Sequence, residues 1–173
     1  MERIELLILR NLIYNEEYTR KVIPFIKDDY FEEQNQKIIF QEISSFIQEY
    51  NKLATKEILS IEVEKRNDIN DTNFKEVVDI ISSLEDEVGE LDWLIDSTEK
   101  WCRDRAIYLA LMESIQLADG KDESKGRDAI PSILSDALSV SFDNHVGHDY
   151  LQDYEKRFES YHRKEDRIPF DLE

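Results

Sequence analysis

Apolar residues recur through most of the chain at intervals of three and four positions, the spacing that places side chains on one face of an α-helix. The first such face consists of Ile4, Leu7, Ile8 and Leu12. A second helix is expected over residues 16–26, because Asn15 is a suitable N-cap and Pro24 limits how far the hydrogen-bond ladder extends. The pattern therefore predicts that the chain begins with short amphipathic helices.

The clearest helical period in the first half of the chain lies in residues 33–50. Its apolar face would consist of Ile39, Ile43, Phe46, Ile47 and Tyr50. Further helical patterns follow Thr55 and Asp71. We expect these helices to form a compact N-terminal bundle over residues 1–88.

Residues 91–118 form a longer run that contains neither Gly nor Pro. A helix of this length would extend about 42 Å. Residues at seven-residue steps, a period that favours packing along a partner helix, are Leu94, Trp101, Tyr108 and Ile115. A polar turn bracketed by Gly120 and Gly126 leads to a second helical pattern that ends at Val140. Residues 89–140 are therefore predicted to form a helical hairpin.

The last part of the chain, residues 141–173, reads as a linker loop followed by a linker helix. The helical period resumes over 149–164, and its apolar face is formed by Leu151, Tyr154, Phe158 and Tyr161. The fold class predicted from the whole pattern is all-α, with a helical bundle, a long hairpin and a linker helix.

The charge of the chain bears on its partners. Its 22 Lys and Arg residues against 40 Asp and Glu residues give a net charge of −18, and acid exceeds base in every third of the chain. A protein that neutralises phosphates needs clustered basic residues, so we expect no tight direct binding of nucleic acid. The short apolar run at residues 6–9 is neither a signal peptide nor a membrane span, so we expect a cytoplasmic protein without a membrane partner.

Candidate catalytic or metal-binding groups are few. His145 and His148 lie in the expected loop with no second cluster to complete four ligands, and a polar hinge is the better interpretation. The Glu159-x-x-His162 element occurs once, whereas helical di-iron sites need two. Cys102 is the single cysteine, within the long helix, and no Gly-rich phosphate loop is present. We therefore predict no catalytic residue, metal site or cofactor in this chain.

Two apolar stripes remain, one on the long helix and one on the linker helix. Each could pack within its own chain or form a subunit interface, and the sequence leaves both possibilities open.

The order of these parts resembles the N-terminal domain and linker of DnaB-type hexameric replicative helicases, closest in pattern to those of T-even-like bacteriophages. The resemblance rests on the first helix, the Asn15-Glu-Glu-Tyr18 turn, Asp29-Tyr-Phe31, Ile39-Phe-Gln-Glu-Ile43 and the hairpin entry Cys102-Arg-Asp-Arg-Ala-Ile107. Arg10-Asn11 and Gln36 stand where the family has a small Gly pair and a His, which indicates a divergent, phage-like member.

The resemblance implies that this chain is the collar of a replicative DNA helicase and not its motor. It implies self-association into dimers or hexamers through the hairpin residues Leu94, Trp101, Tyr108 and Ile115. It also implies docking of primase and a helicase loader, and contact between the linker-helix residues and the motor domain of a neighbouring subunit. ATP and Mg²⁺ would belong to a motor domain that this chain stops short of, and the location would be the host cytoplasm.

The alternative function is a free-standing acidic helical adaptor or DNA-mimic inhibitor, suggested by the net charge of −18. A DNA mimic needs acids spaced like phosphates on one face, whereas here acids and bases are interspersed. This composition favours the collar interpretation.

Overall fold

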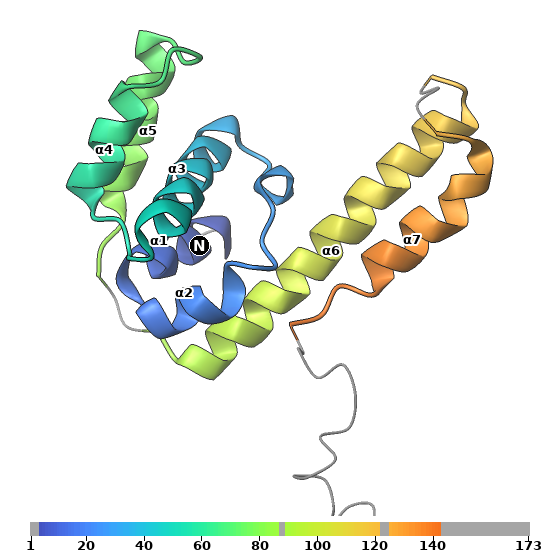
Figure 1. Ribbon diagram of the computed structural model, residues 1–173, viewed down its shortest axis with the longest axis horizontal. Helices are drawn as coiled ribbons and strands as arrows, with labels where there is room; N and C mark the ends of the chain where they lie inside the picture. The colour runs from blue at the N-terminus through green and yellow to red at the C-terminus, as the bar shows by residue number, and fades with distance from the viewer. Residues whose placement is uncertain (1–3, 87–88, 122–124, 143–173) are drawn as a thin grey trace, which may run out of the picture. The chain divides into compact units, whose positions relative to one another are not determined.

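The computed structural model describes residues 4–86, 89–121 and 125–142 (Figure 1). In these ranges the chain forms seven α-helices, two short 3-10 helices and no strand, so the predicted all-α fold is confirmed. The described residues all belong to one compact unit, Met1–Phe142. None of their helices combines the length and the apolar character that crossing a membrane requires.

The first elements are α1 (Ile4–Tyr14), α2 (Glu16–Val22), the 3-10 helix η1 (Asp28–Tyr30) and α3 (Gln34–Tyr50). Asn15 caps α2, as predicted, by accepting a hydrogen bond from the backbone N–H of Tyr18. The helix ends at Val22, earlier than the predicted residue 26, because Pro24 cannot donate the next ladder hydrogen bond.

Two shorter helices, α4 (Lys56–Glu64) and α5 (Asp71–Ser83), pack against each other and on α3. Thr55 and Asn70 cap them by accepting hydrogen bonds from Ile58 N and Asn73 N. A Thr or Asn oxygen at this position satisfies a backbone N–H that the helix leaves without a partner. The start of each helix is therefore encoded locally.

The bundle core is built where the apolar faces of α1, α2 and α3 meet. Its fully buried side chains include Ile8, Leu12, Tyr18, Ile39 and Ile43. Tyr18 also joins α2 to the long helix, because its hydroxyl lies 2.7 Å from Thr98 Oγ1. Burial raises the pKa of Tyr18 well above its ordinary value, so the phenol stays neutral.

The long helix is α6 (Leu91–Ala118), with the bounds that the sequence predicts. Figure 1 shows α2 beside its first part and α7 (Ile130–Leu138) alongside its second part, after the 3-10 helix η2 (Arg127–Ala129). Pro131 lies in the first turn of α7, where a missing N–H is tolerated.

The core is continuous across the predicted boundary at residue 88, since Leu94 and Cys102 belong to the same cluster as Ile8. The three-part division of the chain stays a prediction.

Candidate protein-interaction surface on the long helix

The four residues at seven-residue steps on α6 have different environments. Leu94 and Trp101 are buried, with 2% and 8% of their surface exposed, whereas Tyr108 and Ile115 are 52% and 55% exposed. The first two therefore pack inside their own chain, and the last two face solvent.

Trp101 packs on the segment that joins α2 to α3. Its ring meets Tyr30 edge-on, with ring centroids 6.0 Å apart, and lies 5.1 Å from the centroid of Phe31. Phe31 in turn lies 5.1 Å from Phe40 of α3. This aromatic cluster fixes the first half of α6 on the bundle.

Beyond Trp101, α6 extends past the bundle and carries its exposed apolar residues. Tyr108 and Ile115 are joined there by Leu111, 47% exposed, and Met112, 42% exposed. Residues three, four and seven apart share one face of a helix, so these four side chains form a continuous surface, here called the apolar stripe. Leu111 and Met112 were missed in the sequence because seven-residue steps were followed instead of the full 3.6-residue period.

The opposite side of the same half of α6 is covered by α7. Ala106, Ala110 and Leu117 are buried there, and Ile133 and Leu134 of α7 pack against the core. Small side chains such as Ala allow two helices to approach closely. The hairpin therefore buries one side of α6, and the apolar stripe lies on the side that α7 does not cover.

Arg105 lies where α6 leaves the bundle. Its Nε donates to the carbonyl oxygen of Tyr30 at 2.6 Å, and its Nη1 donates to Glu32 Oε1 at 2.7 Å. The guanidinium also lies 5.1 Å from the ring centroid of Tyr108. Arg105 thus joins residues 28–32, here called the η1 segment, to the beginning of the apolar stripe.

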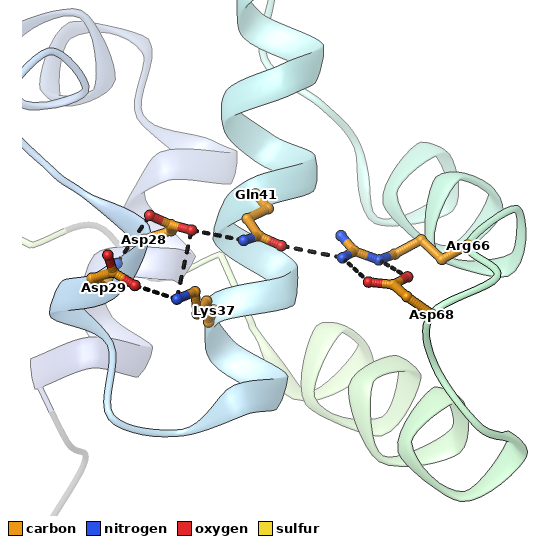
Figure 2. Close-up of polar contacts among 6 residues, drawn as sticks. All are labelled: Asp28, Asp29, Lys37, Gln41, Arg66 and Asp68. Carbon is orange, nitrogen blue, oxygen red and sulfur yellow. Dashed lines mark hydrogen bonds and ion pairs between the residues drawn. The ribbon is translucent and has the colours of Figure 1, made fainter. Parts of the chain in front are cut away.

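The η1 segment is itself held by polar contacts that cross α3. Figure 2 shows Gln41 donating to Asp28 Oδ2 at 2.7 Å and accepting from Arg66 Nη2 at 3.2 Å. Arg66 also makes two hydrogen bonds to Asp68, at 2.9 and 2.6 Å. Asp28 therefore has a pKa below its usual value, first because of the Gln41 hydrogen bond. These contacts tie η1 to the loop between α4 and α5.

A buried carboxylate supports the same segment from α1. Glu5 is only 6% exposed and accepts a hydrogen bond from the backbone N–H of Glu32 at 3.3 Å. Burial raises the pKa of Glu5, and the backbone hydrogen bond from Glu32 partly offsets this effect. The η1 segment, on which Trp101 and Arg105 rest, is therefore anchored on both sides.

Between the η1 segment and the hairpin lies an open groove of about 750 Å³. It is lined by apolar side chains such as Leu109 and Ile133 and by charged side chains such as Lys27, Glu113 and Asp136. Both basic and acidic side chains line the groove, so its charges do not select an anion or a cation.

The described residues hold no group of three or more His, Cys, Asp and Glu side chains placed to bind a metal ion. His145, His148 and His162 lie outside the described residues, as do the linker-helix residues Leu151, Tyr154, Phe158 and Tyr161. Cys102 is fully buried, and this burial raises the pKa of its thiol to about 12, so it is not a reactive nucleophile.

No family profile matches the chain. A comparison with curated proteins found a "DnaB-like replicative helicase" of Enterobacteria phage T4, 34% identical over 174 aligned positions. The chain is similar to a DnaB-like replicative helicase. The alignment covers 96% of this chain and 36% of the phage T4 protein, so the chain spans about a third of the relative's length. The resemblance inferred from the order of sequence motifs is thereby confirmed.

The similarity to the phage T4 helicase extends over almost the whole of this chain. This similarity does not assign a function to the individual surfaces on α6. The structure adds that an exposed apolar surface lies on the long helix, in the hairpin that the sequence singled out.

Proposed function

We propose that this chain is the N-terminal collar domain of a DnaB-type replicative helicase and that it associates with other copies of itself through the hairpin. The relationship to the phage T4 helicase supports the helicase role, since it extends over 96% of the chain. The collar itself contributes no motor activity. ATP and Mg²⁺ would act in a separate motor domain of the whole protein.

The apolar stripe supports the self-association. Four apolar side chains, each more than two-fifths exposed, lie together on one helix of an otherwise strongly acidic chain. Contiguous exposed apolar surface of this kind is typical of protein–protein interfaces, and aromatic side chains and Met are enriched in them. Tyr108, Leu111, Met112 and Ile115 therefore replace Leu94 and Trp101 as the centre of the proposed contact.

Sedimentation of the chain over a range of concentrations tests this proposal. Replacing Ile115 with Glu places a charge in the stripe, and we expect the oligomer to dissociate while the far-UV circular dichroism stays unchanged. Ile61→Glu is a matched control, because Ile61 lies on α4 with a similar exposure of 52%. Unchanged association of the Ile115→Glu variant would place the contact elsewhere.

Primase and a helicase loader are the further partners that we propose for the collar, and the linker helix is proposed to contact a neighbouring motor domain. Co-sedimentation with the purified primase and loader of the same replication system tests the first part. We expect complexes with the wild-type chain, and no complex with either protein would contradict the docking role.

A further inference from the structure

The second helix of the hairpin, α7, has few local interactions that stabilise it. Its nine residues are fewer than the roughly 12–15 that an isolated helix needs in water. The cap residue Ala129 makes no side-chain hydrogen bond to the helix, in contrast to Asn15 of α2 and Thr55 of α4. Within α7 only Ala137 is buried. The helix therefore depends on the contacts that hold it against the rest of the chain.

The contact at the start of α7 is a weak one. Lys125 Nζ, just before η2, lies 2.7 Å from Glu113 Oε1 of α6. The lysine side chain is half exposed in this pair, so solvent screens the attraction and the pair contributes little to stability. The attachment of α7 then rests mainly on its other end.

At that other end the chain runs back towards the bundle (Figure 1). The ring of Phe142 stacks on the ring of Phe25, in the loop between α2 and η1, with centroids 4.6 Å apart and an interplanar angle of 22°. The carbonyl oxygen of Val140 accepts a hydrogen bond from Arg103 Nε at 3.1 Å. Arg103 is in turn oriented by Glu99, whose Oε1 lies 2.7 Å from its Nη2. These two contacts, Phe25–Phe142 and Arg103–Val140, are here called the latch.

The latch joins distant parts of the chain but is only partly shielded from water. Phe25 and Phe142 are both half-buried, and the side chain of Arg103 is 44% exposed. A stacked aromatic pair contributes a small fraction of the stability of a whole domain. The latch can therefore open at a much lower cost in free energy than the unfolding of the bundle.

The bundle keeps its own hold on α6 when the latch is open. Trp101 packs on Tyr30 and Phe31 with ring centroids 6.0 and 5.1 Å apart, and none of these residues belongs to the latch. The contact between α6 and α7, by contrast, includes the small side chains of Ala106 and Ala110, which contribute little apolar area. Parts of a protein with little buried apolar surface open separately from the core.

We propose that α7 is a detachable strap, which separates from α6 when the latch opens while the bundle and α6 stay folded. The closed state is the one in this structure, in which α7 covers one side of the second half of α6. Opening exposes Ala106 and Ala110, so that α6 presents a second apolar side in addition to the apolar stripe. The latch thus controls how much of the long helix is accessible, whether or not the chain self-associates.

Hydrogen exchange of the backbone amides, followed by mass spectrometry, tests the strap. In the wild-type chain the α7 amides should exchange faster than those of α1, which lies in the bundle core. Phe25→Ala and Phe142→Ala should each accelerate exchange in α7 about tenfold and leave α1 unchanged. Because both variants remove the same contact, the double variant Phe25→Ala/Phe142→Ala should exchange no faster than either single variant.

Tyr50→Ala supplies the matched control. It removes an aromatic pair of similar spacing, since the rings of Phe46 and Tyr50 lie 4.7 Å apart, but this pair lies within α3. Exchange in α7 should not respond to it. If Phe25→Ala accelerates exchange in α1 as well, Phe142→Ala decides alone, because Phe142 lies outside the helices of the bundle.

Three results would overturn the proposal. Wild-type α7 amides that exchange at the same rate as those of α1 would show that α7 opens only when the whole domain unfolds. An α7 exchange rate that Phe142→Ala leaves unchanged would show that the latch does not hold the helix. Effects of Phe25→Ala and Phe142→Ala that multiply in the double variant would show that the two rings do not act through one contact.

Discussion

Trp101 of α6 lies edge-on to Tyr30 of η1, with an interplanar angle of 87° and ring centroids 6.0 Å apart. Edge-to-face contact is a preferred geometry for two aromatic rings, because the positive edge of one meets the negative face of the other. Trp101 thus fixes α6 on the bundle, and the second half of the helix is left to extend beyond it.

The burial of Trp101 predicts that this side chain stabilises the fold. Trp101→Ala removes a large buried ring next to Tyr30 and Phe31, and we expect a loss of about 3–5 kcal/mol in the free energy of unfolding, measured by urea denaturation. Leu138→Ala on α7 is the control, since Leu138 is 66% exposed and its truncation should change the stability by no more than about 0.5 kcal/mol. A Trp101→Ala variant that is as stable as the wild type would contradict the structural role.

Arg105 is expected to stabilise the junction between α6 and the η1 segment. Arg105→Met keeps most of the aliphatic packing but leaves the Tyr30 carbonyl without its charged donor, so the free energy of unfolding should fall by about 2 kcal/mol. Arg20→Met removes an ion pair with Glu16 in which both side chains are more than half exposed. That control should cost no more than about 0.5 kcal/mol, because solvent screens exposed pairs. Equal losses for the two variants would show that the Tyr30 contact contributes nothing.

Cys102 is expected to resist thiol reagents in the folded protein. Burial raises the pKa of its thiol to about 12, so the reactive thiolate is scarce at pH 8, and the side chain is fully enclosed. Ellman's reagent should modify native protein only as fast as it unfolds, whereas protein in guanidinium chloride should react at once. Equally fast labelling in both conditions would contradict the burial.

The buried carboxylate of Glu5 gives a stability that depends on pH. The pKa of Glu5 is raised in the folded state. Its contribution to the free energy of unfolding is therefore fully present below the pKa that Glu5 has in the unfolded chain, and it is lost as the pH rises through the pKa of the folded state. Glu5→Gln removes the charge at constant shape, and we expect a higher melting temperature than wild type at pH 7. This difference should shrink as the pH falls towards 4.5.

The exposed residue Glu85 serves as the control for Glu5. Glu85→Gln removes the same charge without relieving any burial. If the melting temperature of Glu85→Gln at pH 7 rises as much as that of Glu5→Gln, the smaller negative charge of the chain, and not the burial of Glu5, is responsible.

The boundaries of the elements were largely predictable from the sequence. Asn15 and Thr55 mark the starts of two helices, because each side chain accepts a hydrogen bond from the backbone N–H three residues later. The absence of Gly and Pro from residues 91–118 allows one long helix. These signals act within a few residues of the chain, so they need no knowledge of distant contacts. The end of α2 was predicted too late because the turn at Pro24 begins before the proline itself.

The sequence by itself therefore determined the helices, their caps and the apolar period on α6, because hydrogen bonding and side-chain periodicity repeat within a helix. It did not determine which of those apolar residues are covered. Leu94 and Trp101 are buried and Tyr108 and Ile115 are exposed, although all four share one period. That difference arises because the bundle reaches only the first half of α6 and α7 covers another side of the second half, which only the packing of distant elements decides.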